Sequence, residues 1–204
     1  MRNLLLLFIL SLTISCSSQG KKSLKGDTEF QRKENARFKD ASKSPLTKKD
    51  LKTFDGLEFF SVDSSFVVTA KFTPTPDDPI FEMATTTTRK PLYKRYGILN
   101  FSLNKKEFQL DLFQNQDFDR DAKYEDYLFL PFTDMTSGNE SYAGGRYLDV
   151  FISKINKNNT VVLNFNNTYN PYCAYDSRYS CPIPPKQNHL RIPVKAGIKA
   201  YKKH

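Results

Sequence analysis

Two hydrophobic periods divide this chain into a short helical part and a longer part made of strands. Between residues 28 and 54 the apolar positions are sparse and fit short helices. From residue 66 onward apolar and polar side chains alternate with a period of two, most clearly at 66–71, 108–113 and 190–196. Such alternation is typical of strands that bury one face.

Further runs suited to strands lie at 80–87, 93–103, 127–132, 147–155 and 161–166, with turn-forming residues between them. With about eight strands and no long helix among them, the pattern predicts a mainly β fold. We expect a single antiparallel β-sandwich or barrel-like domain with short N-terminal helices. Pro193, in the last run, indicates an edge strand or a bulge.

Capping residues place the two helices. Thr28-Glu29-Phe30-Gln31 forms a capping box, which predicts a helix from there to about Ser42. Thr47, with Asp50 three residues later, begins a second short helix that Asp55-Gly56 ends.

The first sixteen residues combine a short positive start, an apolar run from Leu4 to Leu12, and Thr13-Ile14-Ser15-Cys16. The run is about half of the roughly twenty residues that a membrane-spanning helix needs. We therefore interpret residues 1–15 as a signal peptide. The last four of these residues, with a small residue before Cys16, resemble a bacterial lipobox of the relaxed Bacteroidetes type. In a lipobox the cysteine thiol carries diacylglycerol. A plain cleaved signal peptide is the alternative.

The lipobox interpretation sets the expected domain boundaries and location. Residues 16–27 form a flexible lipoprotein tether, and residues 28–204 form the β-rich domain. We expect an outer-membrane lipoprotein of the cell envelope, with the membrane as its partner through lipid on Cys16. Because no acidic stretch follows Cys16, the periplasm-facing side is favoured.

The formal charge of +9 does not indicate a nucleic-acid-binding protein. Acidic residues outnumber basic ones between residues 54 and 185, and the excess of lysine and arginine lies at the two ends. No nucleic-acid recognition motif is present. Basic ends beside a lipid anchor contribute about 1 kcal/mol per Lys or Arg near an anionic membrane, or they simply remain solvated.

Two stretches, 132–148 and 164–188, are too particular for generic strands and turns. Together with Phe54-Asp55-Gly56-Leu57-Glu58-Phe59-Phe60 they resemble the bacterial and archaeal family called domain of unknown function 1684, over roughly residues 36 to 200. The resemblance implies a mostly β fold and a shared site, but no established activity. The usual Pro-Pro-x-Glu-Asn of that family reads Pro184-Pro185-Lys186-Gln187-Asn188 here, so Gln187 replaces a carboxylate.

These two stretches supply the candidate ligand-binding residues. Arg146 offers a planar fork suited to a carboxylate or phosphate, and Gly144-Gly145 allow a sharp turn before it. We expect the loop 134–146 to fold over the segment 166–175 and form the site. An ion pair of Arg146 with Asp134 that only holds the loop is an equally good interpretation. The candidates are Asp134, Thr136, Tyr142, Arg146, Asn166, Tyr169, Asn170 and Tyr175.

Cys173 and Cys181 suggest two kinds of chemistry. In an exported protein we expect them to form a disulfide. Alternatively, Cys173 acts as a nucleophile with His189 as its base. No metal or other cofactor is expected, because two cysteines and one histidine lack the paired spacing of a zinc site. The acidic run 117–126 lacks the Gly and Glu of a calcium loop and suits a solvated loop better.

Three functions follow from these residues. We favour non-catalytic binding of a small anionic or polar ligand, with a Cys173-dependent hydrolase or transferase and a structural partner of envelope proteins as alternatives. An open pocket lined by Arg146, Tyr142 and Asn170 favours the first. Cys173 beside His189 favours the second, and a buried Arg146 paired with Asp134 favours the third.

Overall fold

The computed structural model of the protein describes residues 25–117 and 124–201. Two helices come first, α1 (Glu29–Lys39) and α2 (Lys48–Thr53). Thr28 and Thr47 cap them by accepting hydrogen bonds from backbone N–H groups of the first turn, as the sequence predicts. Helix α1 ends before Ser42, because Ser42 donates its backbone N–H and its hydroxyl to Asp40 and so forms a turn.

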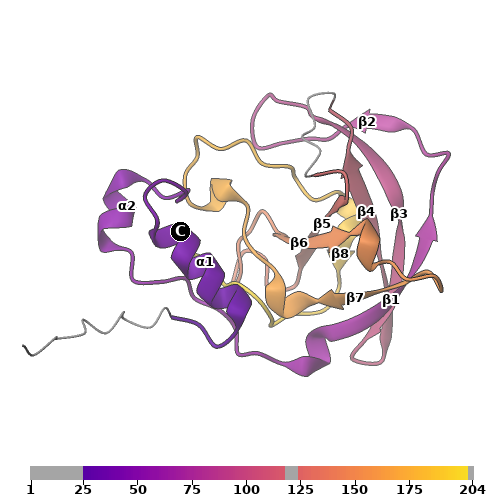
Figure 1. The fold of residues 1–204 in the computed structure, drawn as a ribbon, viewed down its shortest axis with the longest axis horizontal. Coiled ribbons are helices and arrows are strands. Elements are labelled where there is room, and N and C mark those ends of the chain that lie inside the picture. The colour runs from indigo at the N-terminus through magenta and orange to yellow at the C-terminus, as the bar shows by residue number, and fades with distance from the viewer. Residues whose placement is uncertain (1–24, 118–123, 202–204) are drawn as a thin grey trace, which may run out of the picture.

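Eight strands form one curled sheet that resembles half of a barrel (Figure 1). Along the path β6-β5-β4-β3-β1-β7 all neighbours are antiparallel, while β2 joins β3 and the two-residue β8 runs parallel to β5. The predicted mainly β, barrel-like fold is confirmed. The strands are β1 (Val67–Pro74), β2 (Ile80–Glu82), β3 (Leu92–Leu103), β4 (Lys106–Asn115), β5 (Tyr127–Asp134), β6 (Arg146–Phe151), β7 (Thr160–Asn164) and β8 (His189–Leu190).

The last predicted strand, 190–196, is mostly not a strand. Its alternation is real, because Leu190, Ile192 and Val194 are buried in the core. Only His189 and Leu190, the two residues of β8, pair with β5, however. Beyond them the backbone of Val194 bonds to the side chains of Asp134 and Arg146 instead of to a neighbouring strand. The alternation therefore predicted the buried face correctly but not the hydrogen-bond partners of the backbone.

Strand β5 is buried on both faces, which gives the sheet two apolar layers. Leu128, Leu130 and Phe132 point into the main core inside the curl. Phe129, on the alternate face, joins a second cluster with Met83, Tyr93, Phe113 and Tyr147. Because this second layer lies outside the curl, something else must cover it.

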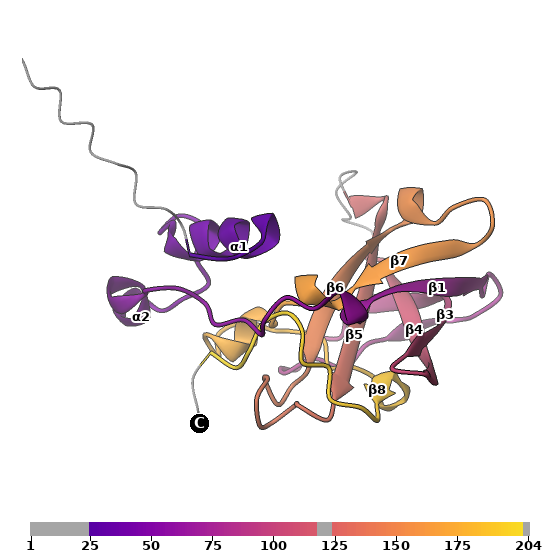
Figure 2. The same ribbon diagram turned by 90° about the horizontal axis from the view of Figure 1, so that it is seen from below.

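The helices cover one end of the sheet, beside β6 (Figures 1 and 2). Phe38 of α1 packs against Tyr175 with ring centroids 4.6 Å apart. These two residues belong to a third apolar cluster, which joins both helices to the segment after β7 and to the C-terminal segment. The helical end is therefore attached to the sheet through the two motif stretches.

The chain just before α1 is also attached to the helix. The Asn35 side chain donates to the carbonyl of Lys25 at 2.8 Å and accepts from the backbone N–H of Leu57 at 2.7 Å. Residues 25–27, which we assigned to a flexible tether, thus contact the folded part. The signal peptide and Cys16 lie outside the described residues. Within 25–117 and 124–201, no helix is both long and apolar enough to cross a membrane.

Candidate functional site

Arg146 is the first residue of β6, and its side chain is fully buried at 0 % exposure. The preceding Gly145 has φ +86, and a Cβ there would lie 2.5 Å from the Phe132 carbonyl oxygen, so the predicted glycine turn is present. Nη2 of Arg146 donates to Oδ2 of Asp134 at 2.8 Å and to the carbonyl of Val194 at 2.7 Å. The guanidinium therefore ties β6, the end of β5 and the C-terminal segment together.

The other Arg146 amino group is used in the same way. Nη1 donates to the carbonyls of Ala196 and Ile198, and the guanidinium lies 5.7 Å and 5.5 Å from the ring centroids of Phe60 and Phe132. Burial lowers the pKa of Arg146, although Asp134 opposes this shift. Both amino groups of this side chain are used within the protein, and Nε, which has no hydrogen-bond partner among the described residues, is buried as well. This arrangement argues against Arg146 as the anchor of a ligand.

Asp134 and Thr136 belong to the same buried network. Oδ1 of Asp134 accepts from the backbone N–H and the hydroxyl of Thr136, at 2.8 Å and 2.7 Å. The Thr136 hydroxyl also contacts that of Ser141 at 2.8 Å. Both predicted site residues are almost completely buried. They hold the loop in shape and offer no surface to a ligand.

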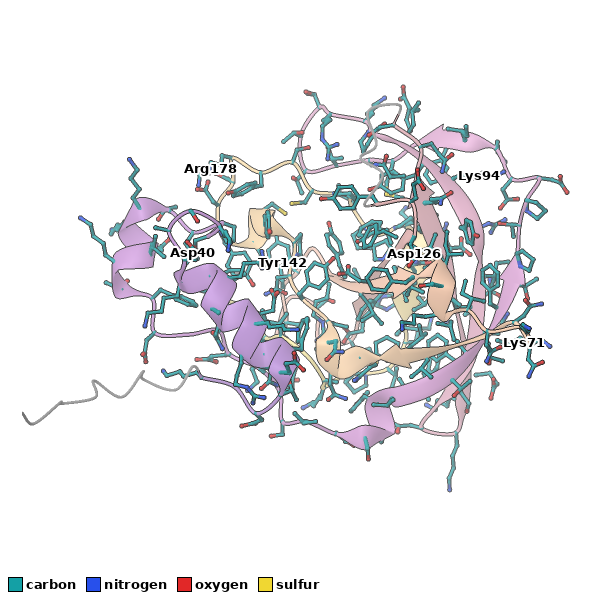
Figure 3. All side chains as sticks on the ribbon, viewed as in Figure 1. Asp40, Lys71, Lys94, Asp126, Tyr142 and Arg178 are labelled. Carbon is teal, nitrogen blue, oxygen red and sulfur yellow. The ribbon has the colours of Figure 1, made fainter. Side chains whose placement is uncertain are left out.

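The loop 134–146 and the segment 166–175 do meet, as the sequence predicts. Arg146 Nη1 lies 3.5 Å from the hydroxyl of Thr168. The Tyr142 hydroxyl lies 3.8 Å from Sγ of Cys173, between the helical end and the sheet (Figure 3). Their contact is confirmed, but it is mostly a packed interface.

Asn166 and Tyr175 also have structural roles. The Asn166 amide donates to the carbonyl of Asp63 at 2.8 Å and accepts from the Asp63 backbone N–H at 3.0 Å, which fixes the start of η1 (Ser64–Phe66). Tyr175 is buried, and this burial raises the pKa of its hydroxyl. Asn170 donates to the carbonyl of Lys199 at 2.9 Å.

An open cavity of about 430 Å³ lies between α1 and the outer face of β5 and β6. Tyr169 and Asn170 are the two predicted ligand-binding residues that line it. Cys181, named from the sequence for the expected disulfide, lines it too, whereas the carboxylate and the ion pair of the lining were not named from the sequence. The lining residues are Phe30, Glu34, Arg37, Tyr93, Tyr127, Phe129, Tyr147, Asp149, Tyr169, Asn170, Pro171, Tyr172, Cys181 and Pro182.

Asp149 is the central polar residue of this cavity. It stands opposite Phe129 in the β5–β6 register, so its side chain lies on the outer face of the sheet. It is exposed to the cavity, and its Oδ1 accepts from the hydroxyl of Tyr127 at 3.0 Å and from that of Tyr169. The surrounding protein raises the pKa of Asp149 by desolvating the carboxylate, although the two tyrosine hydrogen bonds oppose the shift.

Helix α1 supplies the charged rim of the cavity. Glu34 and Arg37, three residues apart, lie on one face of the helix and form an ion pair. Nε of Arg37 donates to Glu34 at 3.2 Å, and Nη1 donates to the hydroxyl of Tyr172. The rim cation is thus already paired, while Asp149 takes part in none of the salt bridges among the described residues.

The two cysteines are neighbours and carry free thiols in this structure, and the disulfide expected for the exported protein stays a prediction. The backbone N–H of Cys173 donates to Sγ of Cys181 at 3.2 Å. Hydrogen bonding from the Cys181 thiol lowers the pKa of Cys173 to about 6. The same contact raises the pKa of Cys181. Nδ1 of His189 is bonded to the Thr133 hydroxyl at 2.9 Å, and no described hydrogen bond joins it to Cys173.

The Pro-Pro-x-Gln-Asn motif borders a second cavity of about 320 Å³. Asn188 donates to the carbonyls of Asp111 and Pro131, at 2.8 Å and 2.7 Å, and so holds the motif on the sheet. Gln187 donates to Oδ2 of Asp111 at 3.1 Å, which an ionised glutamate would be unable to do. Arg95 contacts the same carboxylate at 3.4 Å.

In the part of the chain that the structure describes, no three metal-ligating side chains gather at one point. Most of the acidic run 117–126 lies outside the described residues, so the interpretation of that run as a solvated loop stays a prediction.

The chain belongs to the family described as protein of unknown function, DUF1684, whose sequence profile matches residues 52–199. It is similar to an uncharacterised protein of Haloarcula marismortui, whose structure was solved by NMR in solution. That protein is 31% identical, with a TM-score of 0.66, and the match covers 82% of this chain and 89% of the archaeal one. No curated protein matches the chain.

Proposed function

We propose that this protein binds a small polar ligand without catalysis, in the cavity between α1 and the sheet. The observation that carries the proposal is Asp149, a partly desolvated carboxylate that faces the cavity and bonds to Tyr127 and Tyr169. An oriented polar group among aromatic walls is the usual composition of a small-molecule site.

The nature of the ligand follows from the charges around the cavity. The anionic ligand that the sequence suggested depended on Arg146, which is buried elsewhere in the fold. Arg37, at the rim, is already paired with Glu34. An anion would also be repelled by the carboxylate of Asp149. A ligand that donates hydrogen bonds to Asp149 fits the cavity better.

The two alternative functions have less support. The lowered pKa of Cys173 favours a nucleophile, but the nearest groups are another thiol and the Tyr142 hydroxyl, and neither is a base suited to acyl transfer. The buried Arg146–Asp134 pair supports a structural role for Arg146 inside the fold. This pair identifies no surface for an envelope partner.

The ligand site is tested by titrating isotope-labelled protein with a panel of small polyols, amides, amines and carboxylates. We expect at least one class to shift backbone resonances around the cavity at millimolar concentration. Asp149→Leu should abolish those shifts, whereas Asp77→Leu, at an exposed position outside the cavity, should not. If no class shifts these resonances, or if the shifts persist in Asp149→Leu, the site is not the one proposed.

We further propose that the protein is an envelope lipoprotein, anchored through Cys16 to the periplasmic face of the outer membrane. The lipobox-like Thr13-Ile14-Ser15-Cys16 supports this. Intact-mass analysis of membrane-extracted protein should show a chain that begins at Cys16 and carries the mass of a lipid. Cys16→Ser should release the protein into the soluble fraction, and Cys173→Ser should not. Wild-type protein found wholly in the soluble fraction would contradict the anchor.

A further inference from the structure

The cavity chemistry narrows the ligand class further, if the proposed function holds. We propose that the ligand carries an organic ammonium group, held between the carboxylate of Asp149 and the surrounding aromatic rings. Three observations support this assignment: the arrangement of the rings, the unused oxygen of the carboxylate, and the net charge of the lining.

The rings form walls that meet at steep angles. Phe129 and Tyr147 have centroids 4.7 Å apart and planes inclined at 79°. Tyr147 and Tyr169 are 5.9 Å apart at 89°. Phe129 and Tyr147 are themselves buried, so the rings open to a ligand are those of the half-buried Tyr127 and Tyr169. A compact cation is able to contact such partly covered rings, whereas a flat sugar ring needs one broad exposed aromatic face on which to stack. The lining therefore suits an ammonium group better than a sugar.

The carboxylate of Asp149 has one oxygen left for a ligand. Both tyrosine hydroxyls, of Tyr127 and Tyr169, donate to Oδ1. No residue within the described ranges donates to Oδ2, although the side chain lines the open cavity. The two hydroxyls hold the carboxylate in one orientation, and Oδ2 is free to accept from an N–H or to face a quaternary ammonium.

The lining carries a net negative charge when Asp149 is ionised. Glu34 and Arg37 offset each other, and Asp149 supplies the remaining charge. The titratable groups that act on Asp149 are Tyr127 from β5, Tyr169 from the segment after β7, and Glu34 and Arg37 from α1. A bound cation would stabilise the ionised carboxylate, so affinity should decrease as acid protonates Asp149.

The test compares choline with 3,3-dimethyl-1-butanol, which has the same shape but carbon in place of the charged nitrogen. Calorimetric titration uses the full protein in detergent. We expect choline or ethanolamine to bind at least about tenfold more tightly than the neutral isostere, because the isostere lacks both the ion pair and the cation–π attraction. Glycerophosphocholine and glycerophosphoethanolamine serve as further ligands, to separate a lipid headgroup from a free amine.

Variants separate the charge from the shape of the site. Asp149→Asn should weaken choline binding about tenfold or more and leave the neutral isostere unchanged. Asp77→Asn removes one exposed carboxylate elsewhere and should alter affinity by less than about twofold. Tyr169→Phe keeps the ring but loses the hydroxyl, and serves if Asp149→Asn fails to fold. It should weaken choline binding several-fold, because one of the two bonds that orient the carboxylate is lost.

Each outcome bears on one of the two proposals. Equal binding of choline and the isostere, or no effect of Asp149→Asn on choline, overturns the ammonium assignment. If a polyol or amide shifts the cavity resonances while no amine binds, the ammonium assignment fails and the polar-ligand site stands. If no compound of either kind binds there, both proposals fail.

Discussion

Tyr147 and Tyr169 exchange two backbone hydrogen bonds, of 2.9 Å and 3.0 Å, although 22 positions separate them in the chain. This bridge attaches the segment after β7 to the edge of β6 that does not pair with β5. Asp149 lies two residues beyond Tyr147 on the same strand, so its side chain points to the same face. The bridge thereby places the Tyr169 hydroxyl within reach of Asp149. A backbone contact thus positions the Tyr169 side chain, which forms part of the cavity wall.

The first prediction concerns Asp149 and the pH dependence of stability. Its pKa is raised in the folded state, mainly because the protein desolvates the carboxylate. The resulting loss of folding stability is absent below the unfolded pKa of about 3.9 and develops as pH rises through the folded pKa. Asp149→Asn should therefore melt a few degrees higher than the wild type at pH 8. At pH 3.5 the two proteins should melt alike.

Thermal unfolding followed by circular dichroism at both pH values measures this difference. Asp77→Asn is the matched control, since Asp77 is exposed and has no part in the cavity. A melting difference that is the same at pH 8 and pH 3.5 would show that Asp149 is not desolvated as described.

The second prediction concerns Arg146. Removing one member of a buried, hydrogen-bonded ion pair typically costs about 3–5 kcal/mol. Asp134→Ala should lose that much stability, and Arg146→Lys should lose about 2–4 kcal/mol, because lysine is unable to bond Asp134 and three carbonyls together. Urea unfolding measures both.

Arg191→Lys is the control for this substitution, since Arg191 is exposed and should change stability by less than about 0.5 kcal/mol. If Arg146→Lys kept full stability but weakened binding of a carboxylate ligand, Arg146 would be a ligand anchor after all.

The elements of this fold could be predicted because they depend on local pattern. The alternation at 108–113 places a strand and its buried face, and Thr28 and Thr47 place two helix starts. The meeting of 134–146 with 166–175 was predicted from their unusual composition. In each case the signal lies in residues close together in the sequence.

The cavity could not be predicted in the same way. Asp149 is one acidic residue in an otherwise ordinary strand, and its partners come from α1, from β5 and from the segment after β7. Only the three-dimensional arrangement brings them together. For Arg146 the sequence left two interpretations open, a ligand anchor and an ion pair with Asp134 that holds the loop, and the structure shows the ion pair. A lone arginine in a glycine-rich motif has the same sequence signature whether it binds a ligand or the chain's own carbonyls.

The third prediction concerns the thiol pair. Because the Cys181 thiol stabilises the Cys173 thiolate, the pKa of Cys173 is lowered to about 6. Alkylation of Cys173 by iodoacetamide should rise with pH and reach half its maximal rate near that value. Cys181→Ala should move the midpoint toward higher pH, because it removes the thiol that stabilises the Cys173 thiolate. Mass spectrometry of the alkylated peptides measures both rates.

Cys173→Ser provides the control, because the remaining Cys181 is buried and should react slowly. Under mild oxidation the wild-type protein should lose two hydrogens and stop reacting with iodoacetamide, since the two thiols are neighbours. Equal alkylation of both cysteines at pH 7 would contradict the asymmetry described here.

The fourth prediction concerns the glutamine that replaces the usual glutamate of the Pro-Pro-x-Glu-Asn motif. Gln187 donates its amide to Oδ2 of Asp111 at 3.1 Å. Gln187→Glu would replace that donor by a second carboxylate, and Arg95, at 3.4 Å from Asp111 and also paired with Asp78, would offset only part of the repulsion. The introduced carboxylate should hold its proton above the ordinary glutamate pKa of about 4.3. Its destabilising effect is therefore absent below that pH and appears as pH rises through the raised folded pKa.

At pH 7 we expect a loss of about 0.5–1 kcal/mol in urea unfolding, with the site half open to solvent. The matched control is Gln109→Glu, at an exposed position of β4, where the residue opposite in the β3–β4 pair is Asn100 and not a carboxylate. If Gln187→Glu were as stable as the wild type at both pH 4 and pH 7, Arg95 would be compensating the added charge completely. In that case the Gln187–Asp111 hydrogen bond would contribute nothing that a glutamate could not replace.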